Sequence, residues 1–234
     1  MNNLVITGGT KGIGRAIITY FAAQGWNITF CARSADEVQA LADDLKRKYP
    51  RQSFKGTPVD CAVRSEVLSW SEQVLRELDA IDILVNNAGI YCPGEVSTEA
   101  DGVLEAQLQV NLMSAYYLTR ALLPVMIRRQ SAHIFNMCSI ASLAAYPGGG
   151  SYSISKYALL GFSDNLRLEL KDKGIKVTAV LPGATYSDSW SGSGIDPERI
   201  MEAEDIAKLV YQCSMLSPQA VVERLVVRPQ LGDL

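Results

Sequence analysis

The sequence contains few of the residues that metal centres and histidine-dependent hydrolases require. Its 234 residues include a single histidine, His133, and five cysteines without a Cys-x-x-Cys pair. Zinc sites need clustered Cys and His ligands, and a Ser-His-Asp triad would have to use His133. We therefore expect no metal site and no hydrolytic triad. We interpret His133 as a rim residue and the cysteines as small buried side chains in a reducing compartment.

Long apolar runs and blocks of positive charge are also lacking. No apolar run approaches the ~20 residues that cross a bilayer, and the first residues lack the basic start of a signal peptide. Lysine and arginine number 22 against 25 acidic residues, a formal net charge of −3. A mildly acidic chain without a basic block is poorly suited to bind nucleic acid. These features predict a cytoplasmic protein that binds neither membrane nor nucleic acid.

Strand-like and helical segments alternate along the whole chain. Short apolar segments such as Asn2–Thr7 and Trp26–Ala32 are followed by helical patterns, and we identify seven such strands. Strands that are apolar on both faces belong to a parallel sheet covered by helices on both sides. The sequence therefore predicts an α/β fold. We expect a single doubly wound, Rossmann-type domain over residues 1–234, with a seven-stranded parallel sheet and helices on both faces.

Two segments of this pattern carry predictions of their own. Glu99–Arg129 has the pattern of one long helix, which Pro124 should kink or interrupt. Residues 183–202 follow the sixth strand and are rich in glycine and serine. Ligands of such sheets bind beyond the carboxyl ends of the strands, so we interpret 183–202 as a flexible flap on the substrate side.

A glycine-rich turn joins the first strand to the first helix. It runs Thr7-Gly-Gly-Thr-Lys-Gly-Ile-Gly14, with glycines at 8, 12 and 14. These glycines permit a tight turn and a close approach of backbone to a pyrophosphate at the helix N-terminus. A lone glycine motif is a weak signal. Its position after the first strand of a Rossmann pattern predicts a dinucleotide site.

The end of the second strand indicates which dinucleotide is bound. This strand ends at Ala32-Arg33 without a carboxylate, and Lys11 lies in the glycine turn. An acid at this point would bind a ribose hydroxyl, whereas arginine accommodates a 2′-phosphate. We therefore expect NADP(H) to be preferred, with NAD(H) possible. Asp36 and Glu37 argue against this preference, although acids in the first turn of a helix have an ordinary role with the helix dipole.

Tyr152 and Lys156 are four residues apart in a helical segment, so their side chains share one face. A free phenol titrates near pH ~10, and a neighbouring ammonium favours the phenolate, which makes a tyrosine more useful as an acid–base group. Spacing alone usually reflects packing, however. The pair becomes informative only in combination with the motifs around it.

Taken together, these motifs resemble the short-chain dehydrogenase/reductase family. They appear in the family's order over residues 4 to 183. The matching positions are the Thr7–Gly14 turn, Asn86-Asn-Ala-Gly89, Asn111, Ser139, the Tyr152 and Lys156 pair, and Pro182-Gly183. One departure is Cys138, which stands where many relatives carry a second serine, and which we expect to be buried.

The resemblance implies a role for each member of the catalytic set. Tyr152 would donate a proton to the substrate oxygen, and Ser139 would hydrogen-bond that oxygen. Lys156 would hold the nicotinamide ribose and favour the Tyr152 phenolate. Asn111 would position a water that links Lys156 to solvent.

The resemblance also implies a cofactor site. Asp60 would either contact the adenine or cap the end of the third strand, and the backbone at Thr185 would meet the carboxamide. The implied cofactor-binding positions are Gly8, Thr10, Lys11, Gly12, Ile13, Gly14, Arg33, Asp60, Asn87, Ala88, Gly89, Tyr152, Lys156, Pro182, Gly183, Thr185 and Ser187.

The function expected from this reading is an NADP(H)-dependent oxidoreductase that interconverts a carbonyl and an alcohol on a small molecule. One alternative is a 3-oxoacyl-carrier-protein reductase, which should carry a basic patch near the pocket, and Arg128-Arg129 is the only tight basic pair near the long helix. A second alternative is a cofactor-sensing protein without turnover. The resemblance further implies a homodimer or homotetramer, with an apolar helix face formed by Leu104, Leu108, Leu112 and Leu166.

Overall fold

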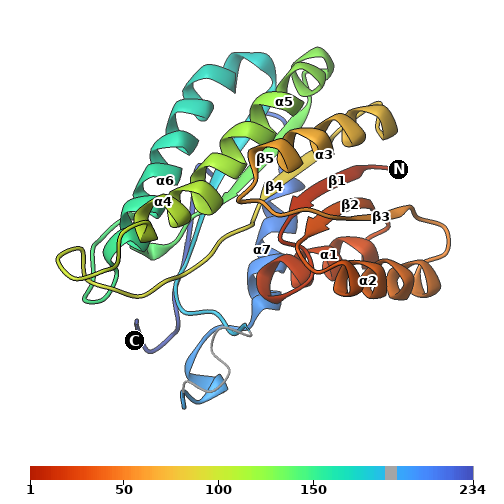
Figure 1. Ribbon diagram of the computed structural model, residues 1–234. Helices are drawn as coiled ribbons and strands as arrows, with labels where there is room; N and C mark the ends of the chain where they lie inside the picture. Colours follow the sequence, from red (N-terminus) through yellow and green to blue (C-terminus); the bar gives the residue numbers. More distant parts are fainter. Residues whose placement is uncertain (188–193, 234) are drawn as a thin grey trace.

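The computed structural model describes residues 1–187 and 194–233. Seven parallel strands form one sheet in the order β3-β2-β1-β4-β5-β6-β7 (Figure 1). The order reverses at β1, which gives the doubly wound topology predicted from the sequence. The strands are β1 (Asn3–Thr7), β2 (Asn27–Ala32), β3 (Phe54–Pro58), β4 (Ile83–Asn86), β5 (Ala132–Met137), β6 (Ile175–Pro182) and β7 (Arg224–Val227).

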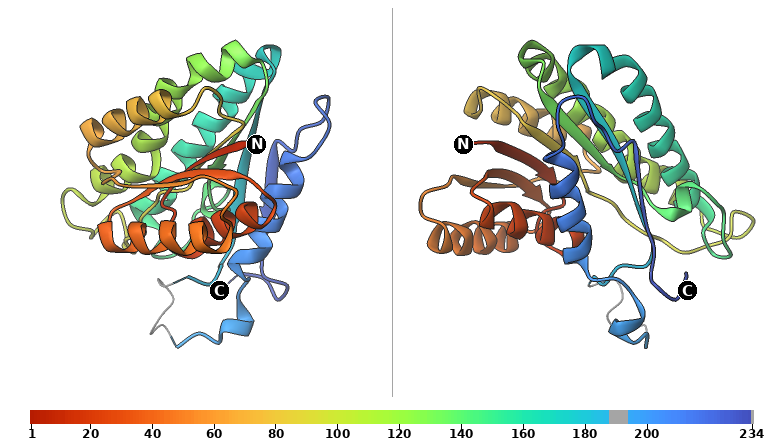
Figure 2. Two further views of the ribbon diagram at one scale, coloured as in Figure 1. Left: turned by 90° about the vertical axis from the view of Figure 1, so that its right-hand side faces the viewer. Right: turned by 180° about the vertical axis from the view of Figure 1, so that it is seen from behind.

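Helices cover both faces of the sheet, as the sequence predicts (Figures 1 and 2). One face carries α1 (Gly12–Ala23), α2 (Ala35–Lys48) and α7 (Ala203–Ser214). The other carries α3 (Arg64–Glu77), α5 (Ser114–Arg129) and α6 (Gly150–Leu170), with the short α4 (Val103–Leu108) leading towards α5.

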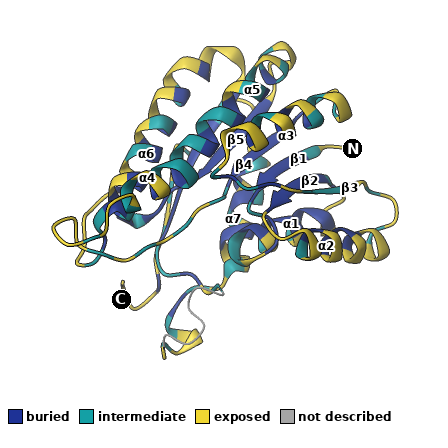
Figure 3. Ribbon diagram, viewed as in Figure 1, coloured by how far each residue is buried: buried dark blue, intermediate teal, exposed yellow. Residues whose placement is uncertain are grey.

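Alternation of side chains along the strands divides the core between these two layers. Leu4 and Ile6 of β1 pack with α1 and α2, whereas Val5 between them packs with α3 and α5. All three side chains are fully buried, and the inner strands β1, β2, β4, β5 and β6 are the most buried part of the sheet (Figure 3). The apolar character of both strand faces in the sequence follows directly from this sandwiching.

The long helix predicted over Glu99–Arg129 differs from expectation in two ways. It begins at Val103, and it is interrupted at η1 (Gln109–Met113), a single π turn, instead of at Pro124. Pro124 lies inside α5. A π turn adds one residue to a helical turn and changes the direction of the side chains beyond it. Here it coincides with Asn111, whose buried side chain bonds to the neighbouring loop.

His133 is not the rim residue expected from the sequence, because it is buried in β5 with 4% of its surface exposed. Its Nε2 lies 2.7 Å from the hydroxyl of Thr178, which itself donates to the carbonyl of Val222. Thr178 therefore accepts from Nε2–H. Nδ1 is unprotonated and has no hydrogen-bond partner among the described residues. Burial, with Lys176 nearby, lowers the His133 pKa to about 3.

The apolar outer helix face also differs from the prediction. Leu166 packs in the core between α5 and α6 and is 5% exposed, so it cannot serve an interface between subunits. The large apolar side chains that α6 exposes are Ile154, Tyr157 and Leu168. Helical periodicity defines a stripe of apolar residues, but only the packed structure shows which stripe faces outwards.

One helical stretch among the described residues, Val103–Arg129, has the length and apolar composition that could span a membrane. Its buried polar side chains bond to other parts of the fold. Asn111 bonds to Ile90 and Ser155, and Thr119 accepts a hydrogen bond from Asn86 of β4. These contacts are those of a core helix in a globular domain.

Candidate active site

Hydrogen bonds attach the glycine turn to the residues that follow β4. The Thr7 hydroxyl accepts from the main-chain N–H groups of Asn87 and Ala88 at 3.0 and 2.9 Å. The Asn87 amide in turn donates to the carbonyls of Thr7 and Gly8. The structure thus brings together two motifs that lie about eighty residues apart in the sequence.

Glycine is required inside the turn for steric reasons. A Cβ on Gly14 would lie 2.2 Å from the Gly8 carbonyl oxygen, and Gly8 and Gly12 have φ values of +66° and +49°. No side chain caps α1 in the part of the chain that the structure describes, and its first turn contains no acid. The N–H groups at this helix end, with Ile13 in its first turn, therefore suit the diphosphate of a dinucleotide.

Lys11 and Arg33 are the two basic residues next to the start of α2: Lys11 is paired with its first turn, and Arg33 precedes its N-cap residue, Ser34. Lys11 forms an ion pair with Glu37 at 2.9 Å, and Thr10 donates to the same carboxylate at 3.1 Å. The bond from Lys11 lowers the pKa of Glu37. Glu37 therefore does more than interact with the helix dipole. It also fixes Lys11 and Thr10 of the glycine turn to the start of α2. Arg33 is exposed beyond the end of β2.

Asp60 forms part of the turn that leads into α3. Its carboxylate accepts from the main-chain N–H of Ala62 at 2.9 Å, and its own N–H donates to Glu66. This is the turn-capping role that the sequence left open as one of two. Contact of Asp60 with an adenine stays a prediction.

Lys156 and Tyr152 lie one above the other in the first two turns of α6. Lys156 is 5% exposed, and its Nζ donates to the main-chain oxygen of Met137 at 2.8 Å. The same Nζ lies 5.7 Å from the centroid of the Tyr152 ring. The ring of Tyr91 packs edge-on against Tyr152, with centroids 4.9 Å apart. A buried cation is therefore held beside a partly exposed phenol.

Asn111 connects the π turn to both sides of this pair. Its Oδ1 accepts from Ile90 N–H at 2.7 Å, while its Nδ2 donates to the Ile90 carbonyl and to the Ser155 hydroxyl. A Cβ built on Gly89 would lie 3.3 Å from Asn111 Oδ1 and 3.5 Å from Lys156 Nζ. The structure thus gathers Asn111, Gly89 and Lys156 at one point.

Ser139 and Cys138 follow β5 directly but have different surroundings. The Ser139 hydroxyl accepts from Ala141 N–H at 3.1 Å at the start of η2 (Ile140–Ser142). Cys138 is 3% exposed, 3.9 Å from the hydroxyl of Ser163, and burial raises its pKa to about 11. Cys138 is therefore a neutral buried thiol, as expected.

The segment after β6 returns towards the glycine turn. Gly183 N–H donates to Val227 at 2.8 Å, and Thr185 forms a parallel bridge with Met201. A Cβ on Gly12 would lie 3.1 Å from the Ser187 Cβ, which places Ser187 against the turn. Part of the predicted flap, 188–193, lies outside the described residues.

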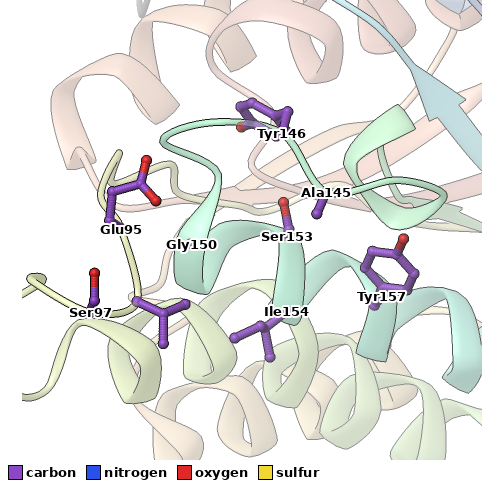
Figure 4. A pocket seen from close by; sticks show the side chains of 9 residues that line it. Glu95, Ser97, Ala145, Tyr146, Gly150, Ser153, Ile154 and Tyr157 are labelled. Atoms are coloured by element: carbon purple, nitrogen blue, oxygen red, sulfur yellow. The ribbon is translucent and has the colours of Figure 1, made fainter.

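Sequence reasoning missed two features of the site. Tyr91, which packs on Tyr152, follows the Asn86–Gly89 motif by two residues, and an aromatic at that point was the available signal. The second feature is a hollow of about 540 Å³ beside the first turns of α6 (Figure 4). It is lined by Glu95, Val96, Ser97, Ala145, Tyr146, Gly150, Ser153, Ile154 and Tyr157.

Comparison with known proteins agrees with this geometry. A family model described as short chain dehydrogenase matches residues 2–196. A sepiapterin reductase from Chlorobaculum tepidum is 30% identical over 241 residues, which cover 99% of this chain and 97% of that protein. L-Sorbose reductase from Gluconobacter frateurii, solved with NADPH and L-sorbose, superposes with a TM-score of 0.88 at 28% identity, covering 97% of this chain and 95% of that one. Serine dehydrogenase from Escherichia coli gives a TM-score of 0.84 at 28% identity, covering 96% of both chains.

The fold and the glycine turn define a Rossmann-type α/β protein. Within that class, the chain belongs to the short-chain dehydrogenase/reductase family of oxidoreductases.

Proposed function

We propose that this protein is an NADP(H)-dependent reductase of small carbonyl compounds, able to interconvert a carbonyl and an alcohol. The observation that carries the proposal is the buried ammonium of Lys156, held by Met137 and facing the ring of Tyr152. Burial of a lysine ammonium costs free energy unless polar or charged groups compensate for the lost water. Here the ammonium lies beside the ring of a partly exposed tyrosine, where it can stabilise negative charge that develops on the phenol oxygen during the reaction.

The residues of the chain divide the work in the reductive direction. Tyr152 donates a proton to the substrate oxygen as negative charge develops there, and the Ser139 hydroxyl hydrogen-bonds the same oxygen. Lys156 would hold the ribose of the coenzyme, and its ammonium stabilises the negative charge on Tyr152 after the proton has been transferred. Asn111 fixes the Ile90 backbone beside Lys156. When bound, the reduced nicotinamide supplies the hydride.

The preference for the phosphorylated coenzyme rests on two cations. Lys11 and Arg33 lie near the end of β2, where the adenosine ribose of a Rossmann-bound dinucleotide is recognised. Glu37 forms an ion pair with Lys11 at 2.9 Å, which keeps the lysine ammonium near the end of β2. Solved relatives that carry NADPH, such as the L-sorbose reductase, support the same assignment.

The structure offers little support for a carrier-protein substrate. Arg129 of the predicted basic pair is bound to Asp82 at 2.9 Å, next to the amino end of β4. The candidate site lies at the carboxyl ends of the strands, whereas this basic pair lies at their amino ends, on the opposite side of the molecule from Tyr152. A small-molecule carbonyl is therefore the better substrate class.

Replacement of Tyr152 by Phe tests the proposal. We expect Tyr152→Phe to lose NADPH oxidation with a panel of diketones, quinones and aldehydes by about a hundredfold or more, while NADPH binding measured by fluorescence is retained. Tyr157→Phe, five residues further along α6 and half-exposed, is the matched control and should retain wild-type turnover. Turnover by Tyr152→Phe near the wild-type rate would refute the proposed role.

We also propose a homo-oligomer assembled through α6, on the basis of its exposed apolar side chains Ile154, Tyr157 and Leu168. Large apolar side chains exposed on one helix are typical of an interface between subunits. Light scattering after size exclusion would measure the mass. A monomeric mass at micromolar concentration would contradict this part of the proposal.

A further inference from the structure

Helix α6 carries the proposed catalytic pair but begins without a capping side chain of its own. The chain enters it through three consecutive glycines, Gly148, Gly149 and Gly150, and Gly149 is the N-cap residue. An N-cap side chain normally accepts a hydrogen bond from the second or third N–H of the helix. Tyr152 is the third residue of this helix, so it lies in the turn that such a cap would stabilise.

The N-cap position cannot accept a capping residue in this packing. A Cβ on Gly149 would lie 2.7 Å from the Ser153 hydroxyl and 2.9 Å from the Tyr146 carbonyl oxygen. At Gly150, a Cβ would meet the Gly94 carbonyl at 2.4 Å, and the φ there is +26°. Serine or aspartate in either place would clash with the backbone, so a cap has to come from another segment.

That segment is the loop between β4 and α4. Glu99 accepts a hydrogen bond from the Ser151 hydroxyl, and its Oε2 also lies 3.5 Å from the Ser151 main-chain nitrogen. Ser151 is the second residue of α6 and is completely buried. A carboxylate here also interacts favourably with the dipole of a 21-residue helix.

Other bonds fix the same loop to the glycines. Gly94 N–H donates to the Gly148 carbonyl at 3.0 Å, and Glu95 accepts from Gly148 N–H at 2.8 Å. Figure 4 shows the loop that carries Glu95 beside the first turn of α6 at Gly150. The glycines therefore take their conformation from the loop, because they have little preference of their own.

The loop also contacts the tyrosine directly at its other end. Tyr91 packs edge-on against the Tyr152 ring at 4.9 Å, and the neighbouring Ile90 is held by both groups of the Asn111 amide. Residues 90–99 thus reach Tyr152 from two sides. At one end they contact its ring, and at the other end they hold the helical turn in which it lies.

We propose that Glu99 is a positioning residue, which caps α6 in trans through Ser151 and so sets the place of the Tyr152 hydroxyl in the site. The inference rests on the proposed function for its effect on turnover, but the cap itself can be measured without turnover. Loss of the cap loosens the first turn of α6 and lowers the fraction of molecules in which the Tyr152 hydroxyl is correctly placed for proton transfer. Reaction rates are sensitive to displacements of about 1 Å, so the effect falls on kcat more than on coenzyme binding.

The first test compares Glu99→Ala with Glu99→Gln and with the control Glu105→Ala, an exposed glutamate on α4. We expect Glu99→Ala to lower kcat about tenfold, with the KM for NADPH changed less than about twofold. Glu99→Gln keeps an oxygen that can accept from Ser151, and it should recover kcat to within about threefold. Ser151→Ala combined with Glu99→Ala should be no worse than Glu99→Ala alone, because both remove the same bond.

The second test measures hydrogen exchange of the amides at 150–156 in the apoprotein. Glu99→Ala should speed exchange there by about tenfold, and Glu105→Ala should not. Unchanged exchange in Glu99→Ala overturns the cap whatever the activity. Faster exchange with wild-type kcat, in an enzyme that turns over, overturns the positioning role. A loss of NADPH affinity as large as the loss of kcat, together with a lower melting temperature, would show a merely structural role and would also overturn the positioning role. An inactive wild-type protein with faster exchange in the variant would retain the cap and refute the proposed function instead.

Discussion

Lys156 donates a hydrogen bond from its ammonium to the main-chain oxygen of Met137, 2.8 Å away. Met137 is the last residue of β5, so the bond joins the second turn of α6 to the strand that leads to Ser139. The lysine is 5% exposed, and its ammonium lies 5.7 Å from the centroid of the Tyr152 ring. The two elements that carry the proposed catalytic groups are thereby fixed to each other.

Replacing Lys156 by Met keeps the length of the side chain and removes its charge. We expect Lys156→Met to lower kcat by at least about a hundredfold and to weaken NADPH binding, because the ammonium serves both the phenolate and the ribose. Steady-state kinetics and fluorescence titration measure the two effects. Lys171→Met, at the exposed end of α6, is the control and should resemble wild type. Normal turnover by Lys156→Met would contradict the proposed chemistry.

Coenzyme selectivity should depend on Lys11 and Arg33. We expect Lys11→Ser and Arg33→Ser each to weaken NADPH binding about tenfold or more, since a hydrogen bond to a charged group contributes about 1.5–3 kcal/mol. NADH lacks the 2′-phosphate, so its dissociation constant should change little. Calorimetry with both coenzymes on wild type and variants provides the comparison. Tighter binding of NADH than NADPH by the wild type would contradict the assignment.

Two glycines provide a matched test of the cofactor turn. Gly14→Ala would place a Cβ 2.2 Å from the Gly8 carbonyl, so it should destabilise the fold by about 1–3 kcal/mol and weaken coenzyme binding. Gly161 lies within α6 with open space around its Cβ position. Gly161→Ala should therefore stabilise the protein by about 0.5–1 kcal/mol. Urea unfolding measures both, and equal effects of the two substitutions would contradict the steric argument.

Stability should fall in mild acid because of His133. Its pKa is about 3 in the folded protein against 6.5 ordinarily, so between these values only the unfolded chain binds the proton. The stability that the neutral ring contributes is complete above pH 6.5 and is lost as the pH falls, by about 2 kcal/mol at pH 5.

Urea unfolding at pH 7 and pH 5 tests this with His133→Gln as the comparison. The variant keeps a donor for Thr178 but does not titrate, so its stability should fall by about 2 kcal/mol less than that of wild type. The carboxylates titrate in both proteins and cancel in the difference. Equal pH dependence in the two proteins would show that His133 does not titrate on unfolding.

Much of the fold follows from local patterns in the sequence. The two-faced apolar strands and the helices between them predict a seven-stranded parallel sheet, which the structure confirms. The sequence predicts a kink or an interruption at Pro124, but that residue lies inside the continuous helix α5 and the interruption is at Gln109–Met113. The break coincides with Asn111, whose buried amide bonds to Ile90 and Ser155, and these partners are distant in sequence.

The sequence by itself determined the chemical groups and their local spacing. Gly8 and Gly12 permit the backbone angles of the turn, and the interval of four residues places Lys156 next to Tyr152 on α6. These properties depend on φ, ψ and one helical turn, which neighbouring residues control.

Only the tertiary structure decided which groups are buried and what meets them. Glu99 and Ser151 are 52 positions apart, and His133 and Thr178 are 45 apart. No local preference specifies such pairs, because their contact depends on how the strands and helices pack and on the closure of long loops. The neutral histidine and the cap on α6 are therefore properties of the folded chain.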